Sequence, residues 1–155
     1  MGAGSISDSN TAAQFLGLGA DFIVGPGFSE NVAHLCNRHN VLYIPGCATV
    51  TEILRASECG AQLIKIFPAD ALGGPNFVKA LKGPLPWLKA VATGGVKATP
   101  QSLTEWFAAG VEAVGLGSDL IGKDVLMRKE YAPLQQWLSK LLEVARSCRG
   151  SGRLK

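Results

Sequence analysis

The apolar residues of this chain fall into six short runs, each bounded by polar or glycine-rich segments. These runs lie near Gly2–Ser5, Asp21–Val24, Leu42–Ile44, Gln62–Phe67, Ala90–Thr93 and Ala113–Leu116. Short runs that are apolar at nearly every position are typical of parallel strands buried on both faces. The pattern therefore predicts six buried parallel strands.

Amphipathic stretches with helical spacing separate these runs. We expect helices near Asn10–Leu18, Glu30–Arg38, Val50–Glu58, Asn76–Lys82, Pro100–Ala109 and Pro133–Arg146. A residue that commonly caps helices precedes three of them; these residues are Ser29, Thr49 and Thr99. A glycine, which tolerates positive φ, follows three of them; these glycines are Gly19, Gly60 and Gly110. Strand and helix alternate every ~20–25 residues, which predicts repeated βα units.

Repeated βα units form either an open doubly wound sheet or a barrel. The sequence lacks a Gly-x-Gly-x-x-Gly turn after its first predicted strand. Glycine or a small polar residue instead follows almost every strand, at Gly4-Ser5, Gly25-Pro26-Gly27, Gly46, Gly94-Gly95 and Gly117-Ser118. Because barrels build their active sites from these loops, the pattern favours a parallel (β/α) TIM-barrel type. The chain has 155 residues, fewer than the ~200–250 of a closed barrel, so we expect an incomplete one of about six units.

The predicted partial barrel occupies residues 1–147, and we expect the basic segment 148–155 to be a disordered tail. Apolar residues make up 47% of the chain and charged residues 17%, a balance typical of globular proteins. The net charge of +3 comes largely from the tail region, and no basic patch is interleaved with aromatic residues. No apolar run approaches the ~20 residues that span a bilayer. We therefore expect neither a nucleic-acid nor a membrane partner.

The four cysteines show no Cys-x-x-Cys spacing, and His34 and His39 are five residues apart, which does not place them on one helix face. These spacings predict reduced thiols and no metal site. No targeting segment is visible at the start of the chain. We expect a cytoplasmic protein that uses no cofactor.

Lys65 stands in the middle of the apolar run Leu63-Ile64-Lys65-Ile66-Phe67. Strand alternation places Leu63, Lys65 and Phe67 on one face. Burial disfavours the ammonium form, and a neutral amine is the nucleophile that attacks a ketone. The position therefore suits Schiff-base catalysis. It equally suits a lysine that extends to solvent or pairs with a carboxylate.

Two consecutive loops carry glycine and hydroxyl residues after the last two predicted strands: Thr93-Gly94-Gly95 and Gly117-Ser118. In barrels, the loops after the last two strands frequently bind phosphate through backbone N–H groups. Tight βα turns that need glycine for geometry alone are the other interpretation. Pro26, between two glycines, is likewise explained by turn chemistry.

These segments together resemble, in the same order, motifs of the 2-keto-3-deoxy-6-phosphogluconate (KDPG) and 4-hydroxy-2-oxoglutarate aldolases. The segment around Lys65 resembles their Lys-Phe-Phe-Pro-Ala strand, and Ile44-Pro45-Gly46-Cys47-Ala48-Thr49 resembles their Ile-Pro-Gly-x-x-Thr. The remaining matches are Gly2-Ala3-Gly4-Ser5, Val24-Gly25-Pro26-Gly27, Thr93-Gly94-Gly95-Val96 and Gly115-Leu116-Gly117-Ser118.

The resemblance implies a class I aldolase that cleaves a keto acid phosphate, KDPG, to pyruvate and glyceraldehyde 3-phosphate, without a cofactor. It implies that Lys65 is the nucleophile that forms the imine. The residues implied to bind the substrate are Ser5, Pro26, Phe67 and Thr93. Those implied to hold the phosphate are Gly94, Gly95 and Ser118. It also implies a homo-oligomer, commonly a trimer.

The family's barrel has two further βα units before the turn that Gly2–Ser5 resembles, and these carry a catalytic glutamate and a substrate-binding arginine. No motif places Glu52, Asp70 or Asp119 in the glutamate's role. We therefore expect turnover by this chain to fall by roughly 10²–10⁴. Two alternatives are an inactive aldolase-like module that binds phosphate or packs against subunits, and a barrel enzyme that does not use Lys65. The six ordered motifs disfavour the second of these.

Overall fold

The computed structural model describes residues 1–122, 127 and 131–152. The chain forms two compact units. The first unit comprises Met1–Phe67 and Trp87–Ala90, and the second comprises Pro68–Pro86 and the chain from Val91 onward. Each unit has its own strands and its own helices.

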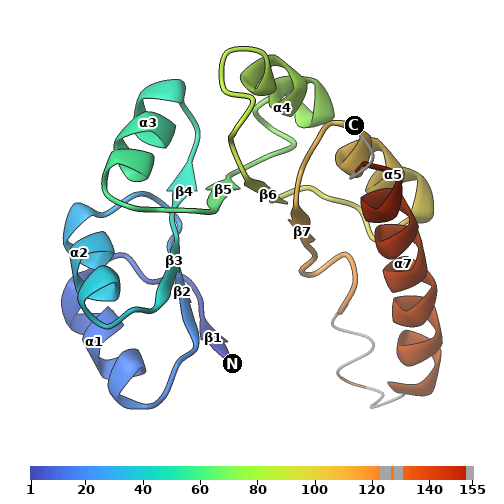
Figure 1. Cartoon of the computed structure of the whole chain (residues 1–155). Coiled ribbons are helices and arrows are strands. Elements are labelled where there is room, and N and C mark those ends of the chain that lie inside the picture. Colours follow the sequence, from blue (N-terminus) through green and yellow to red (C-terminus); the bar gives the residue numbers. More distant parts are fainter. Residues whose placement is uncertain (123–126, 128–130, 153–155) are drawn as a thin grey trace. The chain divides into compact units, whose positions relative to one another are not determined.

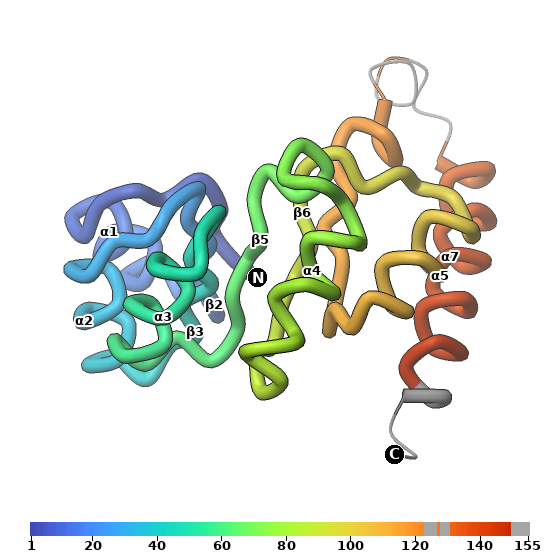
Figure 2. Tube along the Cα trace, turned by 90° about the horizontal axis from the view of Figure 1, so that it is seen from above, coloured from blue at the N-terminus to red at the C-terminus, as the bar shows by residue number. Residues whose placement is uncertain are grey.

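In the first unit, strands and helices alternate as predicted, and the helices lie along one side of the strands (Figures 1 and 2). Its elements are β1 (Gly2–Ala3), α1 (Ser9–Gly17), β2 (Phe22–Val24), α2 (Glu30–Arg38), β3 (Leu42–Ile44), β4 (Gly46–Cys47), α3 (Val50–Glu58) and β5 (Ile64–Ile66). β1, β2 and β3 pair in parallel in that order, and β4 pairs in parallel with β5. The sequence pattern does not predict β4, which is two residues long and follows a proline.

The register of the first sheet explains its core. Ala3, Ile23 and Tyr43 are matched across the three strands, and all three are buried against α1 and α2. Their neighbours Phe22 and Leu42 point to the other face, where they are 36% and 40% exposed. The helix-facing side of this sheet is therefore the packed one.

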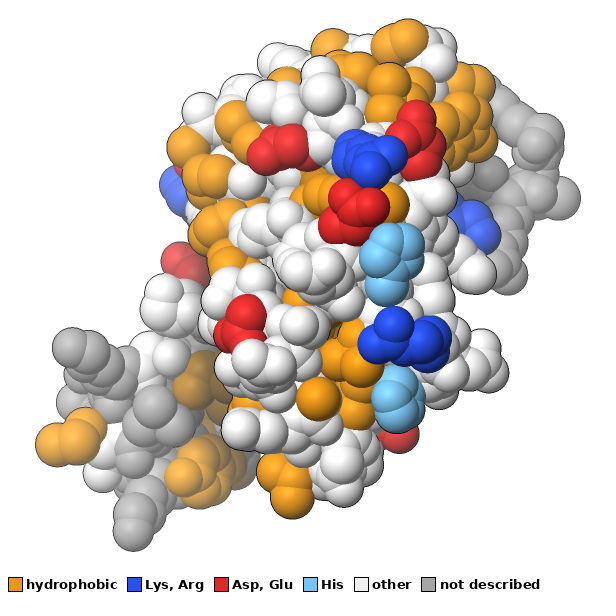
Figure 3. Space-filling view, turned by 90° about the vertical axis from the view of Figure 1, so that its left-hand side faces the viewer, with side chains coloured by type: hydrophobic (Ala, Val, Ile, Leu, Met, Phe, Trp, Pro, Cys, Tyr) orange, Lys and Arg blue, Asp and Glu red, His pale blue; other side chains and the backbone are white. Residues whose placement is uncertain are grey.

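Side-chain caps begin the helices of this unit, as the sequence predicts. Thr49 and Glu52 form a complete capping box on α3, and Ser29 caps α2. Arg55 on α3 bonds both carboxylate oxygens of Glu30 on α2, at 3.1 and 3.0 Å, and also bonds Glu58. Acidic, basic and histidine side chains are intermixed on this face (Figure 3), so local pairs rather than one charged patch link its helices.

The second unit contains α4 (Gly74–Lys82), all but the first residue of β6 (Ala90–Thr93), α5 (Pro100–Ala108), β7 (Ala113–Gly115) and α7 (Tyr131–Gly152). β6 and β7 are parallel, with Thr93 opposite Gly115. α5 and α7 lie side by side (Figures 1 and 2). Ala98, Leu103 and Leu141 form the buried centre between these elements. The parallel pairing in both units confirms the predicted parallel α/β class.

Helix α7 is longer than the sequence pattern predicts, since it runs to Gly152. Residue 148, where we expect the tail to begin, lies inside this helix. Trp137 on α7 donates a hydrogen bond from Nε1 to the carbonyl of Ala98 at 3.0 Å. Within the described ranges, no helix is both long and apolar enough to cross a membrane.

The packing of α7 predicts unequal costs for two adjacent leucines. Leu141 is 2% exposed and Leu142 is 46% exposed. Leu141→Ala removes buried methyl groups and leaves a cavity, so we expect it to lower the free energy of unfolding by about 2–4 kcal/mol. Leu142→Ala, the matched control, should cost less than about 1 kcal/mol. Urea denaturation of both variants measures the difference, and equal costs would show that α7 does not pack as described.

Candidate active site

Lys65 occupies the centre of β5. Its neighbours Ile64 and Ile66 are 1% and 0% exposed, and Lys65 points to the opposite face and is half-buried. The backbone N–H groups of Ile64, Lys65 and Phe67 donate to the carbonyls of three residues in neighbouring segments, at 2.9, 2.9 and 3.1 Å. These acceptors are Lys89, Pro45 and Cys47. The backbone that carries the amine is therefore held on both sides.

Two groups surround the amine of Lys65. Nζ lies 3.5 Å from the carbonyl oxygen of Gly25, a long hydrogen bond, and 4.3 Å from the centroid of the Phe67 ring. In the part of the chain that the structure describes, Lys65 forms no ion pair with a carboxylate. A lysine paired with a carboxylate, one of the interpretations that the sequence allows, is thus not observed among the described residues.

Burial lowers the pKa of Lys65 below the ordinary lysine value of 10.5. The physical cause is desolvation, which disfavours the ammonium form. The same change enlarges the fraction of neutral amine at any pH below that value. The site therefore favours the protonation state that attacks a carbonyl carbon.

The loop after β2 supplies the carbonyl that contacts Lys65. The N–H of Gly25 donates to the carbonyl of Ile44 at 3.1 Å. Side chains would not fit here: a methyl group on Gly25 would lie 2.6 Å from the carbonyl oxygen of Gly27, and one on Gly46 would lie 2.1 Å from that of Pro26. Glycine at these two positions thus permits the close contact between the segment after β2 and the segment after β3.

Ser5 and Pro26 each lie two residues after the end of β1 and β2, at the carboxyl ends of these parallel strands. Both are exposed. Ser5 has a φ of 60°, which is uncommon for a residue other than glycine. Such strain clusters at ligand-binding sites and is compatible with the substrate-binding role predicted for this residue.

In the second unit, Thr93 ends β6 and Gly94 and Gly95 follow it; both glycines have positive φ, 91° and 83°. The carbonyls of Thr93 and Gly94 accept hydrogen bonds from the N–H groups of Ala69 and Asp70, at 2.8 and 2.9 Å. A methyl group on Gly95 would lie 2.2 Å from Cβ of Asp70. Turn geometry alone therefore requires glycine at this position, whether or not the loop binds phosphate.

A carboxylate connects this loop with the one after β7. Asp119, next to the exposed Ser118, accepts a hydrogen bond from the N–H of Ala98 through Oδ2 at 2.5 Å. Because Thr93 and Gly115 are matched across the two strands, both loops leave the same edge of the sheet. The second unit thus holds Thr93, Gly94, Gly95 and Ser118, whereas the first holds Lys65, Phe67, Ser5 and Pro26.

Sequence reasoning missed Tyr43. Its hydroxyl donates to the carbonyl of Gly27 and accepts from the N–H of Ser29, each at 3.2 Å. Burial raises its pKa to about 12, so the hydroxyl stays protonated and remains a donor. The available signal was a hydroxyl inside the otherwise apolar run Leu42–Ile44.

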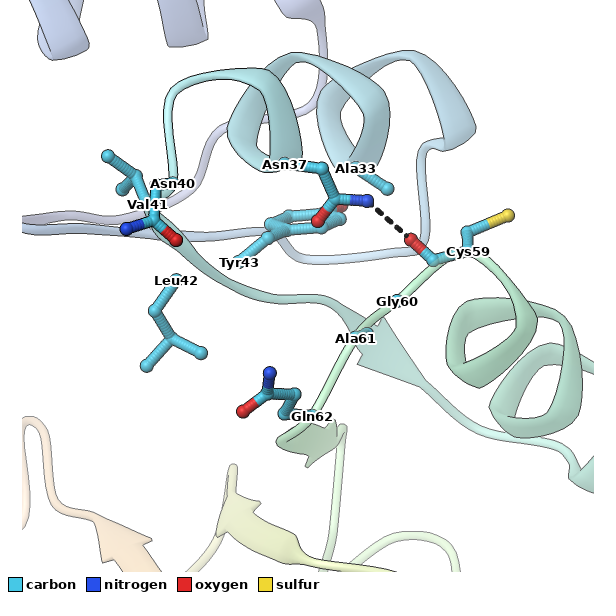
Figure 4. A pocket seen from close by; sticks show the side chains of 10 residues that line it. All are labelled: Ala33, Asn37, Asn40, Val41, Leu42, Tyr43, Cys59, Gly60, Ala61 and Gln62. Carbon is cyan, nitrogen blue, oxygen red and sulfur yellow. Dashed lines mark hydrogen bonds between the residues drawn. The ribbon is translucent and has the colours of Figure 1, made fainter.

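A cavity of about 280 Å³ lies at the opposite ends of the strands of the first unit (Figure 4). Leu42, which begins β3, and Gln62, which precedes β5, line it. The amide of Asn37 donates to the carbonyl of Cys59 at 2.9 Å beside it. Because barrel-type folds place their chemistry at the carboxyl ends of strands, we assign this cavity no catalytic part. Among the described residues, no cluster of three or more His, Cys, Asp or Glu could hold a metal ion.

Comparison with known proteins agrees with this architecture. Residues 1–137 match the aldolase family described as KDPG and KHG aldolase. The 2-dehydro-3-deoxy-6-phosphogalactonate aldolase of Escherichia coli K12 is 42% identical over 121 residues, which are 77% of this chain and 58% of that protein. The chain spans about half to two thirds of the length of the curated relatives that it matches.

Solved structures show the same fold. The structure titled "Native KDPGal structure" superposes with a TM-score of 0.76 at 34% identity, covering 92% of this chain and 69% of that one. The KDPG aldolase of Legionella pneumophila, solved with pyruvate captured as a covalent carbinolamine intermediate, has a TM-score of 0.80 at 26% identity and covers 88% and 65%. The predicted fold class, a parallel (β/α) TIM-barrel type, is confirmed.

The pKa of Lys65 can be measured by competitive acetylation with acetic anhydride, followed by mass spectrometry of the Lys65 peptide. The reaction rate follows the neutral amine, so its pH midpoint reports the amine's pKa. We expect a midpoint below 10.5 in the folded protein and a return toward 10.5 in concentrated urea, which removes the burial. The same midpoint under both conditions would contradict the described burial.

Proposed function

This chain belongs to the KDPG and KHG aldolase family, and we propose that it carries Lys65 as the imine-forming lysine of a class I aldolase. The observation that carries the proposal is the half-buried amine on β5, which has no carboxylate partner among the described residues and lies against Phe67. The Legionella relative, whose title describes a covalent carbinolamine with pyruvate, supports the same chemistry.

The proposed reaction begins when neutral Nζ attacks the C2 ketone of a 2-keto-3-deoxy-6-phospho sugar acid. The carbinolamine loses water to give an iminium ion, which accepts the electron pair of the breaking C3–C4 bond. The C4 hydroxyl loses its proton as glyceraldehyde 3-phosphate leaves. The enamine then takes up a proton at C3, and hydrolysis releases pyruvate and the free lysine. We take KDPG as the substrate and its galactonate epimer, which the E. coli relative's name specifies, as the first competitor to test.

No carboxylate is assigned as the acid–base group in this proposal. Oε2 of Glu52 accepts bonds from the N–H groups of Ala48 and Thr49 and from the Thr49 hydroxyl, each at 2.9 Å. These bonds lower the pKa of Glu52, which makes it a weak base. Asp119 is likewise engaged by a backbone N–H. Both carboxylates serve the structure of their loops.

We assign Ser5, Pro26, Phe67 and Thr93 to the keto acid part of the substrate, and Gly94, Gly95 and Ser118 to its phosphate. One feature of the second unit supports the phosphate assignment: the loops that carry Gly94, Gly95 and Ser118 leave the same edge of the sheet, after its last two strands. We further propose a homo-oligomeric whole protein, such as the trimer that the resemblance implies. The inactive-module alternative makes no use of the desolvated amine and is therefore not favoured.

The decisive test is intact mass after incubation with pyruvate and borohydride. We expect one reduced adduct per chain, absent in Lys65→Ala and retained in Lys89→Ala, because exposed Lys89 contributes only its backbone carbonyl near β5. Cleavage of KDPG and of its galactonate epimer is then measured on the same samples. Wild-type protein that circular dichroism shows to be folded, yet forms no adduct, would overturn the proposal.

The phosphate assignment predicts that Ser118→Ala weakens binding of inorganic phosphate by about tenfold, the loss of one hydrogen bond to a charged group. Ser139→Ala is the matched control, because the hydroxyl of Ser139 bonds the Gln135 carbonyl within α7. Amide NMR shifts of Gly94 and Gly95 during a phosphate titration give both affinities. Equal affinities for the two variants would remove Ser118 from the site.

A further inference from the structure

We propose that Tyr43 is a positioning residue for Lys65, because it fixes the loop whose Gly25 carbonyl contacts the amine. This inference deepens the proposed function and rests on it. Tyr43 lies on β3 and is 4% exposed, and its ring lies against α2 near Ala33 and Asn37 (Figure 4). It does not itself touch Lys65 in the structure.

The hydroxyl of Tyr43 closes the loop from two sides. It donates to the carbonyl of Gly27 and accepts from the N–H of Ser29. The hydroxyl therefore acts as both donor and acceptor toward one segment, residues 25–29. A methyl group on Gly25 would lie 3.0 Å from this oxygen. The buried hydroxyl therefore sets how closely the loop approaches β3.

The loop in turn presents one acceptor to the amine. The carbonyl of Gly25 is 3.5 Å from Nζ, and Gly25 is buried. An acceptor fixed at that point restricts the rotation of Nζ and thereby the direction of its lone pair. The loop also shields the amine from water, and this desolvation lowers the pKa of Lys65. Withdrawal of the loop should therefore leave the amine less oriented and more exposed to solvent.

Tyr43→Phe keeps the ring and removes only the hydroxyl. We expect the Lys65 midpoint in competitive acetylation to rise toward 10.5, by about half a pH unit or roughly threefold in the protonation constant, because solvent reaches the amine. We also expect the plateau rate of pyruvate adduct formation to fall roughly tenfold, since near-attack geometry is lost. A purely structural role would reduce the folded fraction, measured by urea titration, without moving the midpoint. Tyr131→Phe, at a tyrosine 54% exposed on α7, should match wild type.

Gly25→Ala provides a second way to break the same arrangement with Tyr43 intact, because its methyl group would press on both Gly27 and the tyrosine oxygen. It should reproduce the raised midpoint of Lys65. Unchanged midpoints in both variants would overturn the role of Tyr43 whether or not the protein forms an imine. Absence of the pyruvate adduct in wild type would instead overturn the proposed function, while acetylation would still test the positioning of the amine.

Discussion

The half-burial of one amine is the constraint on which the candidate site depends. An ammonium group between two fully buried isoleucines would ordinarily be paired with an acid or carried to solvent by its flexible stem. Lys65 has no acid partner in the described chain, and its nearest partners are a carbonyl and an aromatic ring. Desolvation then lowers its pKa without a neighbouring charge. A fold that keeps such an amine bears a cost in stability, which is common at sites where a lysine reacts as a nucleophile.

The surrounding loops are shaped by close contact between backbones. A side chain on Gly46 would collide with the Pro26 carbonyl, and one on Gly95 would collide with Asp70. These glycines therefore have a structural reason to be present that is independent of any ligand. The same contacts leave a backbone carbonyl beside the amine of Lys65, next to the Phe67 ring, and backbone groups beside the proposed phosphate site. Main-chain groups held in this way are well suited to orient a small anionic substrate, because they need little reorganisation when it binds.

The polar side chains near the candidate site fall into two groups: those that hydrogen-bond the backbone of a loop, and those that are exposed to solvent. Glu52 and Asp119 are committed to backbone N–H groups, and Tyr43 is committed to the loop after β2. Ser5 and Ser118, by contrast, are exposed at the carboxyl ends of their strands. This division separates residues that shape the site from those available to touch a substrate. Glu52 and Asp119 are near the site in sequence, but their hydrogen bonds to backbone N–H groups give no support for a role in proton transfer.

Much of the fold follows from local sequence. The apolar runs, the capping residues Thr49 and Ser29, and the glycines after the helices each act over a few residues, so strands and helices were predictable within small shifts of their ends. β4 and the length of α7 were not predicted, because the first depends on pairing with β5 and the second on packing against α5. The assigned roles of all the site residues remain predictions; these residues are Lys65, Phe67, Ser5, Pro26, Thr93, Gly94, Gly95 and Ser118.

The sequence by itself determined that a lysine stands in a buried parallel strand and that glycine-rich loops follow the strands. Whether that lysine has an acid partner could not be read from it, because its surroundings come from distant segments. The Gly25 carbonyl lies 40 residues earlier in the chain, and Tyr43, on another strand, bonds Gly27 and Ser29 of the same loop. Strand register and the close approach of glycine backbones bring these groups together, and only the tertiary structure decides which atoms meet.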